Sequence, residues 1–278
     1  MSLLIFGGTG LVGSALVEIL PRYGYTVRAP TRAQYDIRTG APPQALFAGV
    51  VGAVNAALVR PQDGDARAAD RVNREFPHEL ARLCAEARIP LVHISSDGVF
   101  SGRAGPYDEA APADAEDAYG LAKRAAEPAQ CLVLRTSVIG PERRAFASLL
   151  CWFLSERGPV SGFTNQMWNG VTSLELARAI ARLFASGLVA PGVCHLHGED
   201  VSKYSLLVRI ARAFGREVTV EPAAAPIARD RRLRTRHPEF LAACRLAPLD
   251  SQLGELPQYC DARGAWRSPA VASSLGHD

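Results

Sequence analysis

A tyrosine and a lysine near the middle of the chain have the types and spacing of a proton-donating pair. Tyr119 and Lys123 are four residues apart in Tyr119-Gly-Leu-Ala-Lys123, so on a helix they lie on one face. A neighbouring ammonium favours the phenolate, so we expect Lys123 to lower the pKa of Tyr119 and prepare it for general acid–base catalysis. The same spacing also arises by chance on helix surfaces, so the pair alone identifies no active site.

Two serines upstream offer a hydroxyl to the same site. Ser95 and Ser96 follow the apolar run 91–94, which we expect to be a strand. The carboxyl ends of parallel strands open onto a ligand crevice. Neighbouring residues of an extended chain point to opposite faces, so only one of the two serines can hold a substrate carbonyl beside Tyr119. A serine that only caps a turn is the alternative for either residue.

A glycine-rich turn close to the N-terminus predicts a dinucleotide site. Its glycines stand between an apolar run and a helical pattern, where they permit a tight turn and a close approach to a pyrophosphate. The helix start adds free N–H groups and a positive dipole end. The alternative is a glycine turn without a ligand. The residues we expect to contact the cofactor here are Gly7, Thr9, Gly10, Leu11, Val12 and Gly13.

The end of the second strand, Tyr25–Ala29, indicates which dinucleotide is bound. It lacks the acid that would bind the ribose 2′-hydroxyl of NAD, and instead Arg28 and Arg32 stand there. A guanidinium suits a 2′-phosphate better than a diol. We therefore predict NADPH as cofactor, with Arg32 as the main contact, Arg28 in reserve and NADH as the alternative. Two solvated arginines without a ligand are the competing interpretation.

Together with further motifs, these residues resemble those of extended short-chain dehydrogenases/reductases, and within that class dTDP-4-dehydrorhamnose reductases. The resemblance spans roughly residues 3–215. Its further motifs are Val54-Asn-Ala-Ala57, Val72-Asn73, Ser95-Ser-Asp-Gly-Val-Phe-Ser-Gly102, Tyr119-Gly-x-x-Lys123 followed by Glu127, and Leu134-Arg-Thr-Ser137.

The resemblance implies roles for individual residues. It makes Ser96 the catalytic serine, with Tyr119 and Lys123. It implies NADPH-dependent reduction of a nucleotide-linked 4-keto-6-deoxy sugar that binds between a nucleotide domain and a C-terminal lobe. Further cofactor contacts are implied for Asp36, Ile37, Asn55, Ala56, Ala57 and Lys123. Substrate contacts are implied for Ser96, Asp97, Gly98, Val99, Tyr119 and Trp168, although Trp168 could equally be a buried packing residue.

Three departures from the reductase pattern concern the substrate. Gly98 stands where these reductases usually have tyrosine, and Val138 stands where a tryptophan usually follows the Thr-Ser pair. The segment Arg234-Thr-Arg-His-Pro238 replaces an arginine-proline-x-asparagine-serine signature. We therefore expect a related keto-sugar nucleotide rather than a defined sugar.

The alternation of strand and helix patterns up to Gly140 requires crossover connections and so a parallel sheet covered on both faces. We predict an α/β fold: a Rossmann-type doubly wound parallel sheet with a smaller C-terminal substrate lobe. The expected division assigns 1–140 with 171–198 to the nucleotide domain and 141–170 with 199–278 to the lobe. A single long amphipathic helix is expected over Ala66–Arg88.

Composition excludes several classes of function. A formal charge of +3 on 278 residues argues against a nucleic-acid binder, and no apolar run is long enough for a membrane span. Six scattered cysteines suggest reduced thiols in a cytoplasmic protein. We expect no metal site, because His195 and His197 lack accompanying ligands. The arginine run 229–236 suits either a solvated surface or a substrate diphosphate.

The expected partner is therefore a small-molecule nucleotide sugar, with a homodimer left open. Two alternatives stay within the same fold. One is a non-catalytic NADP-binding subunit such as the regulatory β subunit of methionine adenosyltransferase, and the other is a nucleotide-sugar epimerase. Dehydratases rank below these, because they usually place acids beside the catalytic serine or threonine and here only Asp97 follows Ser96.

Overall fold

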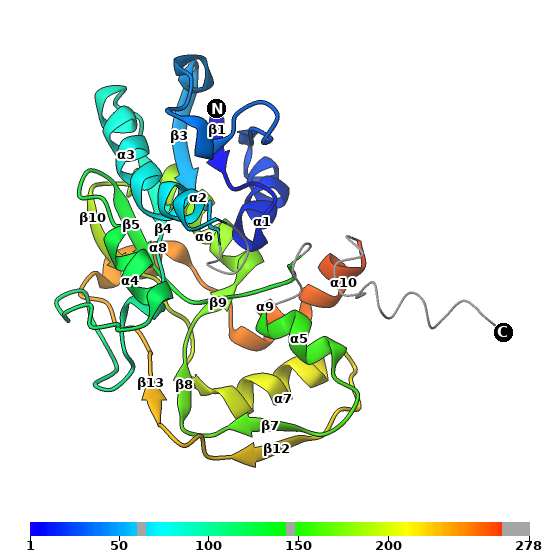
Figure 1. The fold of residues 1–278 in the computed structure, drawn as a ribbon. Coiled ribbons are helices and arrows are strands. Elements are labelled where there is room, and N and C mark those ends of the chain that lie inside the picture. The colour runs from blue at the N-terminus through cyan, green and yellow to red at the C-terminus, as the bar shows by residue number, and fades with distance from the viewer. Residues whose placement is uncertain (60–64, 143–147, 263–278) are drawn as a thin grey trace.

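The computed structural model describes residues 1–59, 65–142 and 148–262 (Figure 1). At its centre lies a sheet of six parallel strands in the order β10-β5-β4-β3-β1-β2. The strands are short and nearly all apolar, as expected for a sheet buried on both faces. Their bounds are β1 (Ser2–Phe6), β2 (Thr26–Arg28), β3 (Val50–Asn55), β4 (Leu91–Ile94), β5 (Leu132–Arg135) and β10 (Gly192–His195).

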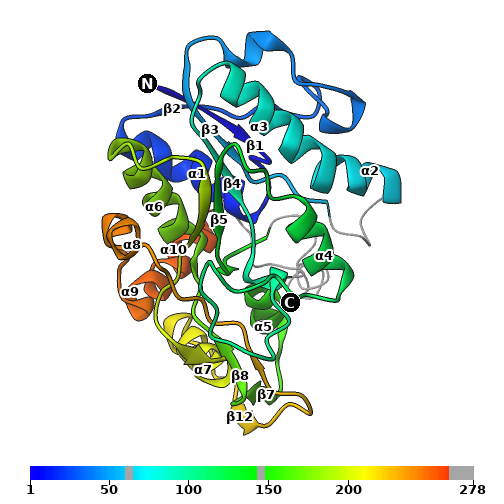
Figure 2. The ribbon, with the colours of Figure 1, turned by 90° about the vertical axis from the view of Figure 1, so that its left-hand side faces the viewer.

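Helices cover both faces of this sheet, which confirms the predicted doubly wound fold. Figure 2 shows the sheet between α1 and α6 on one side and α2, α3 and α4 on the other. The strand order reverses between β1 and β3, and such a switch point is where open α/β sheets bind ligands. The helix bounds are α1 (Leu11–Ile19), α2 (Ala66–Asp70), α3 (Phe76–Glu86), α4 (Ala118–Ala125) and α6 (Ser173–Ala185).

The long helix predicted over Ala66–Arg88 is interrupted. Between α2 and α3 the chain forms a π-helix, η5 (Arg71–Glu75). The physical reason is Pro77 near the start of α3: it has no N–H to donate to the carbonyl of Asn73, so the regular ladder breaks there. The described residues around the sheet also contain the 3₁₀ turns η1 (Leu20–Tyr23), η2 (Ile37–Thr39), η3 (Gln44–Phe47) and η6 (Asp97–Val99).

A second group of elements lies beyond the carboxyl ends of the sheet strands (Figure 1). In it β7 pairs with β12, and β8 lies between β11 and β13. The paired strands β6 (Val138–Ile139) and β9 (Val171–Thr172) connect it to the sheet. Its other elements are α5 (Leu149–Ser155), β7 (Val160–Phe163), β8 (Gln166–Trp168), β11 (Val201–Ser202), α7 (Lys203–Ala213), β12 (Val220–Ala223) and β13 (Arg229–Asp230).

The sequence of Phe146–Ser155 also predicts a helix, which is observed as α5, and residues 146–147 lie outside the described ones. No helix of the part the structure describes is long and apolar enough to cross a membrane. The proposed boundaries between the nucleotide domain and the lobe stay a prediction. One hydrophobic cluster includes residues of α1, α6 and α7 and so runs through both.

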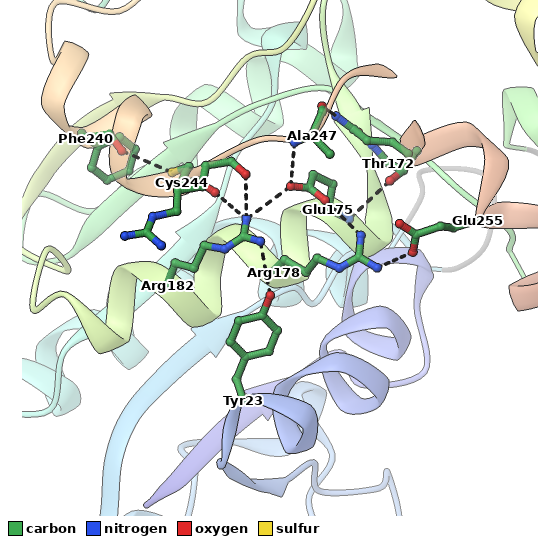
Figure 3. Close-up of polar contacts among 11 residues, drawn as sticks. Tyr23, Thr172, Glu175, Arg178, Arg182, Phe240, Cys244, Ala247 and Glu255 are labelled. Atoms are coloured by element: carbon green, nitrogen blue, oxygen red, sulfur yellow. Dashed lines mark hydrogen bonds and ion pairs between the residues drawn. The ribbon is translucent and has the colours of Figure 1, made fainter. Parts of the chain in front are cut away.

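Three C-terminal helices that the weak sequence periodicity did not predict pack along α6. They are α8 (Pro238–Cys244), α9 (Leu249–Gly254) and α10 (Leu256–Asp261). A polar network joins them to α6 (Figure 3). The buried carboxylate of Glu175 accepts from Arg178 at 3.0 Å, Arg182 at 3.3 Å and the backbone N–H of Ala247 at 3.1 Å.

The outer ends of the same arginines reach other segments (Figure 3). Arg178 also pairs with Glu255, while Arg182 donates to the carbonyl of Cys244 at 2.6 Å and to the hydroxyl of Tyr23 at 3.3 Å. Glu175 therefore binds the guanidinium groups of Arg178 and Arg182, which in turn connect the C-terminal helices to the side of the sheet on which α6 lies.

We expect Glu175→Ala to lower the free energy of unfolding by roughly 3 kcal/mol, because it leaves two partly buried guanidinium groups without their shared carboxylate. Urea denaturation measures the change. The control is Glu86→Ala, which removes an exposed ion pair with Arg82 and should cost no more than about 1 kcal/mol. Equal losses for the two variants would contradict the role given to the network.

Candidate active site

The loops that follow β1 and β3 touch at the switch point of the sheet. Gly7 has a φ of +81°, and a Cβ there would lie 2.5 Å from the carbonyl oxygen of Ala56. A Cβ on Gly13 would lie 2.0 Å from the carbonyl oxygen of Gly7. Both positions therefore admit only glycine, because backbone would have to move to make room for any side chain.

Gly10 is different, because its glycine is not required by internal packing. A Cβ there would meet only the carbonyl oxygen of Gly7, at 3.4 Å. Gly10 and Thr9 are exposed, and α1 begins after Gly10 without a side-chain cap. The N–H groups of Leu11 and Val12 thus open the helix with no side chain to accept from them. This exposed, uncapped turn fits a dinucleotide pyrophosphate as the sequence predicted.

The two arginines after the second strand differ in their surroundings. Arg28 donates to the carbonyl of Ala48 at 2.5 Å, whereas Arg32 is exposed and lies close enough to Asp36 to help lower the pKa of that acid. Hydrogen bonds from Arg38 are the main cause that lowers the pKa of Asp36 to about 2. Ile37 packs on the core near β1. Arg32 is therefore better placed than Arg28 for an external phosphate, while adenine contacts of Asp36 and Ile37 remain predictions.

A narrow pocket opens beside these loops. Its wall is held by two amides. Asn55 Nδ2 lies 3.2 Å from His93 Nδ1 and its Oδ1 accepts from the N–H of Ala57 at 3.2 Å. Asn73, in the π-helix, accepts from the N–H of Val59 at 2.9 Å and donates to the carbonyl of the same residue at 2.6 Å. The residues that line the pocket are Ala57, Leu58, Val59, Asn73, Pro77, His93, Tyr119, Ala122 and Lys123.

The turn after β4 separates the two serines as expected. Ser95 Oγ donates to Glu127 Oε1 at 2.6 Å, on the side of β5 and away from Tyr119. Ser96 Oγ accepts from the N–H of Gly98 at 3.0 Å, donates to Asp97 Oδ1 at 3.2 Å and lies close enough to Tyr119 to oppose the rise in its pKa. The structure thus places Ser96, not Ser95, beside the tyrosine.

Tyr119 lies against Gly98. A Cβ on Gly98 would be 2.8 Å from Tyr119 Cε1 and 3.1 Å from Ser96 Oγ. Gly120 is equally confined, since its Cβ would lie 2.4 Å from the carbonyl oxygen of Gly98. The two glycines let the start of α4 approach the serine turn, which brings the phenol and the serine hydroxyl together.

The pKa of Tyr119 shifts in the direction opposite to the one predicted from its neighbour Lys123. Burial raises the pKa of Tyr119, with Asp97 acting in the same direction and Ser96 and Arg231 against it. Lys123 is only 9% exposed and donates to the carbonyl of Ile94 at 3.1 Å. Burial lowers the pKa of Lys123 to about 8, against the attraction of Glu127. The predicted lowering of the Tyr119 pKa is therefore wrong for this structure, in which loss of solvation at the phenol is the largest effect on that pKa, although the side chain as a whole is 38% exposed.

The predicted substrate residues fall into two groups. Asp97 and Gly98 lie beside Ser96. The side chain of Val99 instead packs inside a small core with Phe100, which contradicts a side-chain contact with substrate. Trp168 is 3% exposed, and its Nε1 donates to Ser137 Oγ at 2.8 Å, so it is chiefly a packing residue.

Sequence reasoning missed two cations near Asp97. Burial raises the pKa of Asp97, and both Lys203 and Arg231 oppose that effect, so both lie close to it. Lys203 begins α7, with Nζ 5.5 Å from the centre of the Trp168 ring. Lys203 and Arg231 come from segments that are far along the chain from the motifs. Of the two, only Arg231 belongs to a stretch that the sequence analysis singled out, the arginine run 229–236.

The arginines of the run 229–236 have different partners, and whether any of them binds a substrate diphosphate stays a prediction. Arg229 donates to the carbonyl of Ser101 at 2.6 Å. Arg232 and Arg234 both pair with Asp200, at 2.7 and 2.6 Å. Only Arg231 among these lies near Asp97 and Tyr119. His195, one of the two histidines judged structural, is buried with Nδ1 2.9 Å from the carbonyl oxygen of Arg234.

Comparison with known proteins gives a consistent assignment. The RmlD substrate binding domain family matches residues 1–239. A dTDP-4-dehydrorhamnose reductase of Streptomyces griseus is 34% identical over 137 residues, which are 47% of this chain and 45% of that protein. A protein of the same name from Mycobacterium tuberculosis is 29% identical over 218 residues, covering 72% of this chain and 70% of its own length.

Solved structures share the fold at lower sequence identity. A dTDP-4-dehydrorhamnose reductase from Clostridium acetobutylicum has a TM-score of 0.78 and 21% identity, covering 94% of this chain and all of its own. One from Bacillus anthracis, solved with NADP, has a TM-score of 0.73 and 19% identity over 92% of this chain and 98% of its own. The family match over most of the chain shows that this protein belongs to the RmlD substrate binding domain family, the dTDP-4-dehydrorhamnose reductase-like branch of the extended short-chain dehydrogenases/reductases.

Proposed function

We propose that this protein uses NADPH to reduce the keto group of a nucleotide-linked 4-keto-6-deoxy sugar, with Ser96, Tyr119 and Lys123 as catalytic residues. The observation that carries the proposal is the approach of Ser96 Oγ and the Tyr119 ring to the same point at Gly98, beside the pocket that Tyr119 and Lys123 line. The names of the reductases to which the chain is similar support the reaction, as does a dTDP-4-keto-6-deoxy-D-glucose reductase of Streptomyces niveus, 29% identical over 206 residues.

The chain provides matching groups for each part of the cofactor. The turn Gly7–Gly13 with the uncapped start of α1 would hold the pyrophosphate, and Arg32 the 2′-phosphate. Lys123 would bind the nicotinamide ribose from the pocket it lines with Ala57. Bound NADPH supplies a hydride to the ketone carbon.

Ser96 and Tyr119 would bind the ketone oxygen and supply its proton. Ser96 Oγ donates a hydrogen bond to the ketone oxygen and so fixes it beside the phenol. Tyr119 gives its proton to the alkoxide as charge develops on that oxygen. In the free protein the raised pKa of Tyr119 keeps that proton in place, as a reduction requires. Val138 is smaller than the tryptophan usual at its position, whereas the space at Gly98 is filled by the ring of Tyr119.

A panel of dTDP-, UDP- and GDP-linked 4-keto-6-deoxyhexoses, with NADPH oxidation as readout, tests the function. Saturable turnover of at least one of them is expected in a cytoplasmic enzyme of this class. Tight NADPH binding without turnover of any would contradict the reductase and favour the non-catalytic binding subunit. Interconversion of two sugar nucleotides without net NADPH oxidation would favour the epimerase.

Tyr119→Phe should reduce kcat by about 10²- to 10⁴-fold, because it removes the proton donor and keeps the ring. The dissociation constant for NADPH should hardly change. Steady-state kinetics and fluorescence titration of the cofactor measure the two effects. Tyr23→Phe, which removes a hydroxyl remote from the site, is the matched control and should keep full activity. Full activity in Tyr119→Phe would show that another group is the acid.

Arg32→Ala should weaken NADPH binding by roughly 10- to 100-fold and leave NADH binding nearly unchanged, because a charge-assisted hydrogen bond to the 2′-phosphate is lost. Titration of each variant with both cofactors measures the preference. Arg28→Ala, whose guanidinium is bonded to Ala48, should change the preference less. Equal affinity of the unaltered protein for the two cofactors would contradict the assignment.

The buried ammonium of Lys123 makes stability depend on pH. Its pKa is about 8 in the folded chain and 10.5 as the ordinary value, so above pH 8 the folded state binds fewer protons than the unfolded one. Stability should therefore rise with pH in that window. Relative to Lys123→Met, the cofactor-free protein should gain about 2 kcal/mol between pH 7 and pH 9.5, by urea denaturation. A constant difference between the two proteins would show that Lys123 is not desolvated.

A further inference from the structure

His93, in β4, is a buried histidine of which only one ring nitrogen is paired within the protein. Its side chain is 2% exposed, and Nε2 has no hydrogen-bond partner among the described residues. The other nitrogen, Nδ1, lies 3.2 Å from Nδ2 of Asn55, the residue of β3 that stands beside His93 in the register of the sheet. A buried polar atom that stays unpaired is unfavourable, so Nε2 indicates a ligand that the protein is built to bind.

The neighbours of His93 determine which of its nitrogens carries the proton. Asn55 Oδ1 accepts from the N–H of Ala57 at 3.2 Å, so the amide presents its donor, Nδ2, to the imidazole. Nδ1 therefore accepts, and the proton of the neutral ring is on Nε2. Burial and the nearby ammonium of Lys123 hold the pKa of His93 well below its usual value, so the ring is neutral. The ligand must accordingly accept a hydrogen bond from Nε2.

The pocket that His93 lines limits the size of this ligand. Its free volume is about 10 Å³. That is roughly the space that one water molecule needs, and too little for a sugar or a nicotinamide ring. Tyr119 and Lys123 of α4 and Asn73 of the π-helix line the same pocket, so a molecule in it lies among polar groups from three elements.

The hydrogen-bonding groups around the pocket suit a water molecule. Among the described residues the ammonium of Lys123 donates only to the carbonyl of Ile94, at 3.1 Å, although it has three N–H groups. One water oxygen can accept from this ammonium and from His93 Nε2. Asn73 Oδ1, which accepts from the N–H of Val59 at 2.9 Å, has a second lone pair for a proton of the water. The water would then have about three partners, as buried water molecules usually do.

We propose that this pocket is a binding site for one water molecule, and that His93 is a positioning residue that holds the water against the ammonium of Lys123. The water provides a partner for an N–H of the ammonium inside the protein and leaves another N–H for the cofactor. Without it, the charged form of Lys123 would be less well solvated, and more of the lysine would be neutral. The water site belongs to the free protein, and only its consequence for catalysis rests on the proposed function.

The experiment determines the pKa of Lys123 in the cofactor-free protein from the pH dependence of stability. Each protein is compared by urea denaturation with the same protein carrying Lys123→Met, so the difference reports the lysine. The other titratable groups that face Lys123 or His93 are Glu127, Tyr119 and His78, and they are common to both members of each pair.

The unaltered protein should begin to gain stability near pH 8, because above its folded pKa of about 8 the buried lysine binds fewer protons than in the unfolded chain. In His93→Phe, whose ring fills the pocket and has no donor, the gain should begin roughly one pH unit lower. This shift is that expected for loss of a hydrogen bond to a charged group. An unchanged onset in His93→Phe would overturn the role of His93.

Two further variants separate this role from a general effect on packing. His93→Gln keeps an acceptor for the amide of Asn55 and a donor for the water, and should restore most of the shift. His195→Phe replaces another buried histidine, outside the pocket, and is the matched control. It should leave the onset near pH 8 even if it lowers stability at every pH. Equal shifts in His93→Phe and His195→Phe would contradict the proposal.

Crystal structures observe the water directly. The cofactor-free protein should show one ordered water molecule at hydrogen-bond distance from both His93 Nε2 and Lys123 Nζ, and His93→Phe should lack it. A pocket without this water in the unaltered protein, or a hydroxyl of the cofactor in its place when NADPH is bound, would refute the site. None of the stability measurements involves substrate, so failure of the reductase reaction would leave this proposal standing, and failure of the water site would leave the reaction standing.

Discussion

The geometry of the site depends on a buried ion pair behind it. Glu127, just after α4, accepts from Arg135 of β5 at 2.9 and 2.7 Å and from Ser95 of the serine turn at 2.6 Å. Both charged side chains are 9% exposed, and the guanidinium also lies 5.3 Å from the centre of the Phe100 ring. Removing one partner of such a pair leaves an uncompensated buried charge, so the three segments are held in one arrangement. That arrangement fixes where α4 presents Tyr119 relative to Ser96.

The second constraint is that glycines stand where two segments of the chain come into contact, because a side chain at these positions would not fit. Gly98 and Gly120 bring the start of α4 against the serine turn, Gly7 brings the first loop against the loop after β3, and Gly13 brings α1 against Gly7. At each contact a Cβ would approach another atom to 2.8 Å or less. The glycine at 98, which departs from the tyrosine usual in similar reductases, is thus compatible with close packing of Tyr119. A larger residue there would have to displace the phenol or turn away from it.

The sequence predicted those features of the site that depend on the local geometry of single strands and helices. The carboxyl ends of β1, β3 and β4, the helical spacing of Tyr119 and Lys123, and the opposite directions of Ser95 and Ser96 all follow from periods of two and 3.6 residues. Lys203 and Arg231 could not be found in this way, because they reach Asp97 from α7 and from the chain after β13. The sign of the Tyr119 pKa shift was missed for a related reason: burial depends on the whole fold, whereas the charge of Lys123 is visible in the motif. The burial of Val99 likewise reflects its packing against Leu233, far along the chain.

The pKa shifts of Tyr119 and Lys123 in the free protein suit the donation of a proton, as in a reduction, better than the removal of one. Burial raises the pKa of Tyr119 and lowers that of Lys123, so each group is biased towards its neutral form. A neutral phenol carries the proton that an alkoxide must receive. The preference for the neutral form therefore does not oppose the reaction before negative charge develops on the substrate oxygen. As that charge grows beside Tyr119, it stabilises the ammonium form of Lys123 and favours transfer of the phenolic proton. Because Tyr119 is 38% exposed in the free protein, a bound substrate has to displace the remaining water from the phenol, and that displacement strengthens the hydrogen bond from the phenol to the alkoxide.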